Sequence, residues 1–179
     1  INILESLLPL SKNDIIDSIT QLEILQKQIS SKNLTSNNPA ISLAKCISSS
    51  PVVYYPFGLE SAAIRFKNSL QENAKIQALT EDVIEASHNS IVCWDFPSNL
   101  LPIIIEGEDD YIKTKERWII LKEFFNSKQI KFNEIKSIHG NILSKLVHLI
   151  YLFDYTSIYR AVLSETDPSP VEPIDFISS

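Results

Sequence analysis

A carboxylate and an imidazole stand near one another in the middle of this 179-residue sequence. Glu72 lies on a strongly helical pattern, and His88 follows just past an expected turn. Such a pair can move protons on and off carbon and oxygen, because protein surroundings can bring both groups close to neutral pKa values. The two residues therefore predict general acid–base chemistry, with Glu72 and His88 as the catalytic groups.

Each residue also has a plainer interpretation. A glutamate on an amphipathic helix usually faces solvent, where Glu72 could pair with Lys75 at i, i+3. A lone histidine is more often a surface or structural group. Glu85 and His88 are also spaced at i, i+3, which is half of a di-iron carboxylate motif, but no second Glu-x-x-His occurs. We therefore expect no metal site.

The composition excludes several classes of function. The net charge is −6 and no basic stripe occurs, which argues against general nucleic-acid binding. The sequence has only three glycines and no P-loop, GxGxxG or GxSxG motif. Kinases, dinucleotide enzymes and α/β-hydrolases are therefore poor candidates.

The cysteines and the N-terminus bear on the compartment. Cys46 and Cys93 form no CxxC pair, so we expect reduced apolar fillers in a cytoplasmic protein. Residues 1–5 contain no basic region, which is unlike a signal peptide, and no apolar stretch is long enough to span a membrane. The sequence contains no Met, which leaves open whether it is a complete translation product.

Hydrophobic periodicity predicts the elements that must position Glu72 and His88. Helices are expected over residues 11–31, from about 39, 59–75, 110–126 and 139–164. Strands are expected over residues 51–57, 100–105 and 130–135, with a brief extended piece at 91–94. Acidic residues at 106–110 are expected to open the fourth helix, where negative charge is favourable.

Alternating strands and helices predict an α/β fold with a parallel sheet flanked by helices on both faces. Ligands of such sheets bind beyond the C-terminal ends of the strands, here residues 55–58 and 106–108. Residues 1–37 are expected to form a helical adaptor and linker, and residues 38–179 the main domain. The two N-terminal helices pack either on something outside that domain or on its own sheet, and the sequence does not decide between these alternatives.

Four separated motifs resemble one known family. Residues 63–75, AIRFKNSLQENAK, resemble the base-carrying helix of bifunctional phosphoglucose/phosphomannose isomerases, A-x-R-W/F-K-x-x-x-x-E-N-A-K. EASHN at 85–89, DYTSIY at 154–159 and DPSPV at 167–171 resemble later motifs of that family, in the same order. The resemblance covers about residues 38–177.

The resemblance implies a SIS (sugar isomerase) domain with a flavodoxin-like sandwich, the second of two in the family. It implies conversion of glucose 6-phosphate and mannose 6-phosphate to fructose 6-phosphate through an enediolate, without metal or organic cofactor. Glu72 would be the base. His88 would assist ring opening from the neighbouring subunit of a homodimer.

The resemblance assigns no substrate-binding residues here. The family's phosphate-holding Ser/Thr loop and an active-site arginine lie in the first SIS domain. Ser178 stands where the family has a C-terminal lysine. Four other polar residues in the motifs are expected to support the structure of the site: Arg65, Lys67, Asn73 and Asn89.

Two other functions remain as alternatives. The chain could be a non-catalytic SIS module that binds a sugar phosphate and regulates a partner. It could also be a purely structural dimerisation domain. In that case Glu72 would be exposed and paired with Lys75, with no cleft between it and a neighbour's His88.

Overall fold

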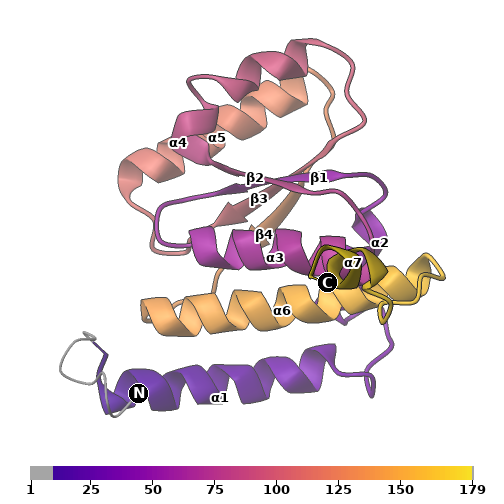
Figure 1. The fold of residues 1–179 in the computed structure, drawn as a ribbon. Helices are drawn as coiled ribbons and strands as arrows, with labels where there is room; N and C mark the ends of the chain where they lie inside the picture. The colour runs from indigo at the N-terminus through magenta and orange to yellow at the C-terminus, as the bar shows by residue number, and fades with distance from the viewer. Residues whose placement is uncertain (1–9, 179) are drawn as a thin grey trace.

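A computed structural model of the chain describes residues 10–178, and its centre is a four-stranded parallel sheet (Figure 1). The strands are ordered β2-β1-β3-β4. Their bounds are β1 Pro51–Tyr55, β2 Leu79–Asp82, β3 Leu101–Glu106 and β4 Asn133–Lys136. The predicted α/β fold with helices on both faces is therefore confirmed. Residues 1–9, which include the stretch expected to be unlike a signal peptide, lie outside the described residues.

The two central strands explain why the sheet forms where it does. β1 and β3 are apolar along almost their whole length, and the side chains of Val53, Ile103, Ile104 and Ile105 are fully buried. Strands that are covered on both faces need such unbroken apolar runs. β2 and β4 are short edge strands with polar residues, and their pairing with the central strands is also parallel.

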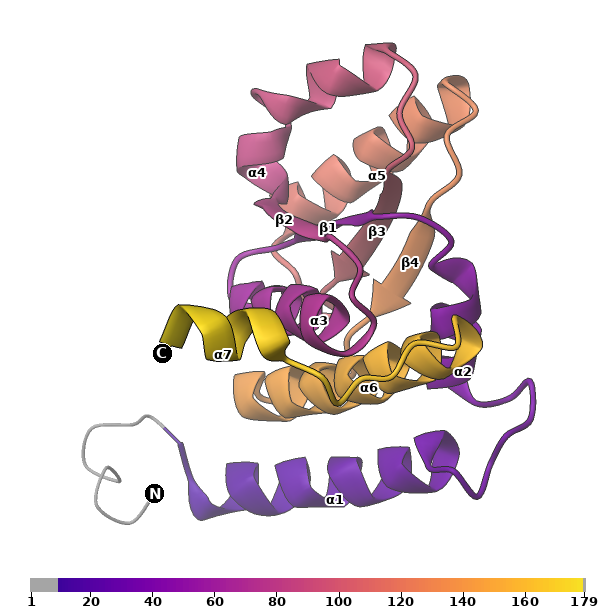
Figure 2. The ribbon, with the colours of Figure 1, turned by 45° about the vertical axis from the view of Figure 1, so that its right-hand side comes forward.

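One face of the sheet is covered by α3 (Glu60–Asn73) and α6 (Ile142–Leu163), which lie side by side (Figures 1 and 2). Phe66 of α3 and Phe153 of α6 are fully buried, and their rings stack with centroids 4.2 Å apart. This aromatic contact joins the two helices directly, so the position of α3 depends on α6.

The N-terminal helices also pack on α6. α1 (Lys12–Ile29) forms an outer layer against it, with the hydroxyls of Ser18 and Ser144 2.9 Å apart between them, and α2 (Pro39–Cys46) contacts its other side. Asn38 caps α2 through bonds from the Ala40 and Ile41 amides. Neither alternative drawn from the sequence describes α1 fully, because it rests on a helix of this domain and not on the sheet.

The opposite face carries α4 (Val83–Ala86), η1 (Ser90–Asp95) and α5 (Ile112–Ser127). Its core is aromatic: the indole N–H of Trp94 donates to the hydroxyl of Tyr54 at 2.8 Å, and both rings pack on Phe125. Burial raises the pKa of Tyr54 to about 12. These contacts fix the segment that follows His88.

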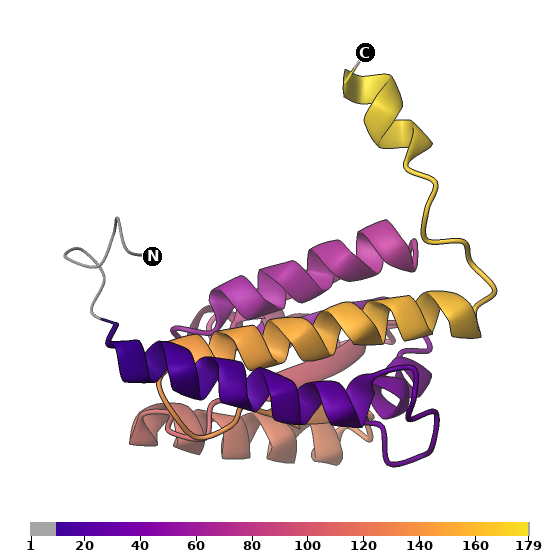
Figure 3. The ribbon, with the colours of Figure 1, turned by 90° about the horizontal axis from the view of Figure 1, so that it is seen from below.

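A last helix, α7 (Glu172–Ser178), follows a proline-rich turn after α6. The chain passes from the end of α6 beyond the C-terminal end of α3, and α7 projects away from the layered body (Figure 3). Within residues 10–178, no helix is both long and apolar enough to cross a membrane.

Several local predictions were wrong. Residues 90–95 form a 3-10 helix and not the extended piece expected at 91–94. The acidic residues do not open α5: Glu106 ends β3 in an ion pair with Lys122, and Asp110 accepts bonds from the Gly107 amide and the Trp118 indole. Both cysteines are free thiols as expected, but they are exposed and fill no core.

Candidate functional site

Glu72 lies in the last turn of α3. A helix between parallel strands runs back across the sheet, so its C-terminal end lies at the edge where the strands begin. Consistent with this, the side-chain amide of Gln71 donates to the carbonyl of Ala78, just before β2, at 3.5 Å. Glu72 is therefore at the opposite edge from the strand ends where the sequence predicted a ligand.

The side chain of Glu72 borders a groove of about 420 Å³ between α3 and the C-terminal tail. The other lining residues are Gln71, Lys75, Pro170, Val171, Glu172, Pro173 and Ile174. Glu72 is exposed, and among residues 10–178 its carboxylate has no hydrogen-bond or ion-pair partner. The carboxylate is thus available to a molecule in the groove.

Lys75 binds carbonyl groups instead of the Glu72 carboxylate. Its ammonium donates to the backbone oxygens of Glu72 and Pro170, both at 2.6 Å, and to that of Pro168 at 3.4 Å. A cation at the end of a helix also suits the negative end of the helix dipole. The ion pair that would have made Glu72 an ordinary surface residue is therefore not formed.

Polar residues of the motifs hold α3 on α6. The Arg65 guanidinium donates to both carboxylate oxygens of Asp154, at 2.9 and 3.1 Å, and the Ser69 hydroxyl donates to the same group at 2.7 Å. The hydrogen bonds between Arg65 and Asp154, together with the charge of Asp154, raise the pKa of Arg65. One helical turn after Ser69, the side-chain amide of Asn73 donates to the Ser157 hydroxyl at 2.8 Å. Glu72 is thus flanked by contacts that fix its helix.

His88 lies on the other side of the sheet. α4 and η1 pack in the core of the opposite face, whereas α3 packs in the core that it shares with α6. The His88 side chain is exposed, and its backbone N–H donates to the carbonyl of Glu85 at 2.9 Å. The side chain of Asn89 accepts from the Ser90 amide and begins η1. Within one chain, Glu72 and His88 therefore stand on opposite faces.

Other residues singled out from the sequence have separate positions. α4 ends at Ala86, so Glu85 and His88 share no continuous helix face, which is unlike the di-iron arrangement. Lys67 is half-buried on α3, and Ser178 is exposed at the end of α7. Neither of these two has a hydrogen-bond or ion-pair partner among residues 10–178.

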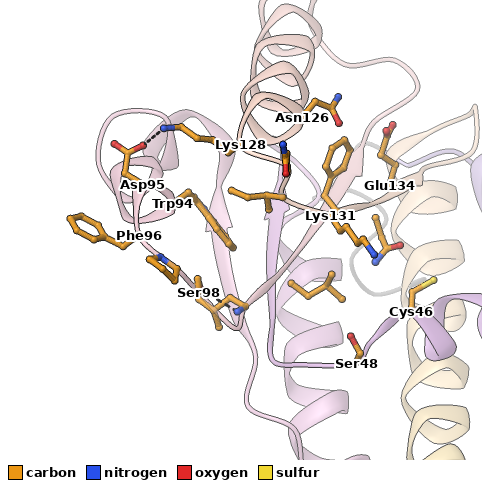
Figure 4. Close-up of a pocket in the computed structure, with 17 residues that line it drawn as sticks. Cys46, Ser48, Trp94, Asp95, Phe96, Ser98, Asn126, Lys128, Lys131 and Glu134 are labelled. Carbon is orange, nitrogen blue, oxygen red and sulfur yellow. Dashed lines mark hydrogen bonds and ion pairs between the residues drawn. The ribbon is translucent and has the colours of Figure 1, made fainter.

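Another, larger cavity contains neither Glu72 nor His88. It measures about 1130 Å³ and opens between η1, the end of α5 and the start of β4 (Figure 4). Four charged residues line it, of which Asp95 and Lys128 form an ion pair of 2.7 Å. At the strand ends predicted to bind ligand, Phe57 and Gly107 border a pocket of only about 230 Å³. The volume of a cavity therefore does not identify the functional site.

Sequence reasoning missed the tail that forms one wall of the groove. Residues 170–174 reach Glu72 through Lys75, which is separated from Pro170 by 95 positions in the chain. The signal was present in two motifs already noted, since Lys75 ends the first and residues 167–171 form the last. Nothing in the spacing of either motif indicated that they touch.

Comparison with known proteins identifies similar sequences. The profile of the family described as the bacterial phospho-glucose isomerase C-terminal SIS domain matches residues 36–179. The bifunctional phosphoglucose/phosphomannose isomerase of Caldicellulosiruptor bescii is 32% identical over 134 residues, covering 72% of this chain and 40% of that protein. The enzyme of the same name from Aquifex aeolicus is 28% identical over 71% of this chain and 41% of its own length. The chain thus spans about two fifths of these relatives.

Solved structures share the fold. A glucose-6-phosphate isomerase like protein from Thermus thermophilus aligns with a TM-score of 0.71 and 17% identity, over 93% of this chain and 56% of that one. The C-terminal domain of glucosamine-fructose-6-phosphate aminotransferase from Francisella tularensis gives 0.62 and 13%, over 90% and 49%. At such identities the likeness concerns the fold alone.

Proposed function

The chain belongs to the family of the bacterial phospho-glucose isomerase C-terminal SIS domain, and from this premise we propose that it forms part of a phosphosugar isomerase. The substrates would be glucose 6-phosphate and mannose 6-phosphate, each converted reversibly to fructose 6-phosphate. This proposal is supported by the names of the relatives and by the matching motifs around Glu72 and His88.

Glu72 would act as the base. It removes the proton from C2 of the open-chain aldose while the C1 carbonyl oxygen gains the electrons, which gives an enediolate. Returning the proton to C1, as the proton of the C2 hydroxyl moves to the oxygen on C1, produces the ketose. A carboxylate suits this work because the same group accepts and returns one proton.

His88 would assist ring opening by moving a proton at the ring oxygen, a task for a group that titrates near neutral pH. Because Glu72 and His88 stand on opposite faces of one chain, the proposal places His88 in the neighbouring subunit of a homodimer. No residue of this chain is assigned to the substrate phosphate.

One observation carries the proposal most directly. Glu72 lines a groove, and its carboxylate has no hydrogen-bond or ion-pair partner among residues 10–178, whereas Arg65 and Asn73 of the same motif are bound to α6. A base must reach its substrate, while the residues that support its helix need not. Arg65 and Asn73 fit the second description, and Glu72 fits the first.

The proposal is tested by Glu72→Gln, which keeps the shape of the side chain and removes the base. We expect kcat on glucose 6-phosphate and on mannose 6-phosphate to fall by about 10²–10⁴-fold, the usual contribution of a general base. Glu60→Gln is the matched control, because it makes the same change on an exposed residue at the other end of α3. It should keep normal turnover.

The outcome of this assay also separates the alternatives. Retained turnover in Glu72→Gln would exclude Glu72 as the base. If the folded unmutated protein binds fructose 6-phosphate but converts none of the sugar phosphates, either the chain is a non-catalytic module or turnover needs the family's first SIS domain. Adding such an upstream domain decides between the two. If the unmutated protein binds none of the sugar phosphates, a purely structural role is favoured.

A further inference from the structure

The contacts of Lys75 with the C-terminal tail go beyond what a surface lysine usually makes. Its three N–H donors have three backbone carbonyl partners, in Glu72, Pro168 and Pro170. One of these belongs to the candidate base itself, and the other two belong to the segment that forms the opposite wall of the groove. The same ammonium group thus joins both sides of the site.

The local conformation of residues 167–170 holds these carbonyls in place. Pro168 and Pro170 have fixed φ angles, and each restricts the residue before it, so this segment has few conformations to lose. The Ser169 amide donates to the carboxylate of Asp167 at 2.9 Å, which fixes the turn between the prolines. This bond lowers the pKa of Asp167, and the nearby charge of Lys75 acts in the same direction.

Hydrophobic burial contributes little to the position of the tail. α7 has no buried residue, and it projects beyond the layered body of the domain (Figure 3). Val171 and Ile174 line the groove immediately after the two carbonyls that Lys75 binds. The position of this wall therefore depends on Lys75 more than on hydrophobic burial.

We propose that Lys75 is a positioning residue that clamps residues 168–174 beside Glu72 and thereby forms the substrate groove. The inference rests on the proposed function, and it adds a role for the tail. Lys75 itself touches no reacting atom. It acts through the segment that it holds, which would close against the bound sugar phosphate.

Hydrogen–deuterium exchange of the full chain tests the clamp without any need for turnover. In Lys75→Met, which keeps the length of the side chain but cannot donate, we expect backbone amides of residues 171–178 to exchange at least about tenfold faster. Lys75→Arg retains donors and charge, and should restore most of the protection. Lys67→Met is the control, since Lys67 lies within α3, about two turns before the end of the helix that Lys75 follows, and binds no tail carbonyl.

A second arm connects the clamp with the ligand. Fructose 6-phosphate should slow exchange of residues 171–174 in the unmutated protein, and should do so only at a concentration raised at least about tenfold in Lys75→Met. Tail exchange that is equal in Lys75→Met and Lys67→Met would overturn the inference, and so would a tail that does not respond to the sugar phosphate.

Failure of the proposed base has a different signature. If Glu72→Gln keeps full turnover while Lys75→Met loosens the tail and weakens sugar phosphate binding, the base assignment is wrong and the clamp stands. If Glu72→Gln is inactive and the tail is unaffected by Lys75→Met, the base stands and the clamp is wrong.

Discussion

The charged residues near the groove have different partners. The Lys75 ammonium is satisfied by carbonyl dipoles and the Arg65 guanidinium by a carboxylate, while Glu72 is left to solvent. Glu72 and Lys75 are only three positions apart in the sequence, at the end of α3, and could have formed an ion pair with each other. The separate partners of Lys75 and Arg65 keep the Glu72 carboxylate available, which is the arrangement that a base requires.

A different residue, His148, links stability to pH. It lies on α6 beside a pocket lined by α1, α2 and β4, where its Nδ1 atom is buried without a hydrogen-bond partner. The charged groups lining the same pocket are Glu134 and Lys136 of β4, and the thiol of Cys46 also borders it. Burial lowers the pKa of His148 from its ordinary value near 6.5.

The sign of the pH effect follows from this shift. Below pH 6.5 the unfolded state binds a proton at His148 that the folded state does not, so stability falls on acidification until the lowered folded pKa is reached. We expect this one group to contribute a slope of at most about 1.4 kcal/mol per pH unit in that window. Urea unfolding between pH 7 and pH 5 measures it. His148→Gln should remove this slope from the plot of unfolding free energy against pH. The control is His88→Gln, because His88 is exposed, and this variant should keep the slope. Equal plots for the two variants would refute the role of His148.

At the scale of elements, the site depends on how α3 is joined to α6. The joint has an apolar part, the stacked rings of Phe66 and Phe153, and a polar part in which Asp154 accepts from Arg65 and Ser69. The stack fixes the distance between the helices. The directional bonds fix the rotation of α3, and hence the direction in which Glu72 points.

Removing the bonds of Asp154 should lower the stability of the protein and loosen the orientation of α3. Asp154→Ala removes three hydrogen bonds, and Asp154 is only 33% exposed, so we expect the free energy of unfolding to fall by about 1–2 kcal/mol. Glu116→Ala provides a control, because its bond to Lys113 is an exposed pair on α5 and should be worth less than about 0.5 kcal/mol. Urea unfolding compares the two, and a similar loss in both variants would contradict a special role for the α3–α6 joint.

The elements also show which parts of the fold the sequence could predict. β1, β3, α1, α3 and α6 carry long apolar patterns, and their predicted positions are confirmed within a few residues. β2 has no such pattern, because it is a four-residue edge strand whose Leu79 is half exposed, and only its pairing with β1 makes it a strand. The short apolar run at 91–94 was expected to be extended, but it lies within a 3-10 helix. Trp94 is buried there, and its indole donates to the Tyr54 hydroxyl.

The candidate site was predictable to a similar degree. Glu72 and His88 could be named from their motifs, and the supporting roles expected for Arg65 and Asn73 agree with their contacts to α6. The groove could not be predicted, since its second wall arrives from the end of the chain through bonds between backbone carbonyls and one side chain. Backbone acceptors have no signature in a sequence.

At the scale of the whole molecule, the four strands separate the two candidate catalytic groups. Glu72 belongs to the layer of α3 and α6, and His88 belongs to the layer of α4, η1 and α5. A residue after α4 cannot serve the groove beside α3 of the same chain while the sheet stands between them. In a dimer with a two-fold axis, His88 of one subunit could reach the groove beside Glu72 of the other. The symmetry would then repeat this contact, which gives two sites per dimer.

Mixing two inactive variants tests that arrangement. If Glu72→Gln and His88→Gln are each inactive, an equal mixture that exchanges subunits should recover about a quarter of the normal sites, since half of the dimers are mixed and each mixed dimer has one intact site. Turnover is measured before and after refolding the two proteins together. A mixture that stays inactive while subunits demonstrably exchange would place both residues in one chain's site, or remove His88 from it.

The place of α6 in the chain has a consequence for how the protein is made. α1, α2 and α3 all rest on this helix, although more than 60 residues lie between the end of α3 and its start. On the ribosome, the apolar faces of the earlier helices therefore stay uncovered until residue 163 has emerged. Contacts between segments so distant in the sequence form slowly, and the intermediate that precedes them is prone to aggregate. Nascent chains of this domain are thus expected to be clients of holding chaperones until translation has passed α6.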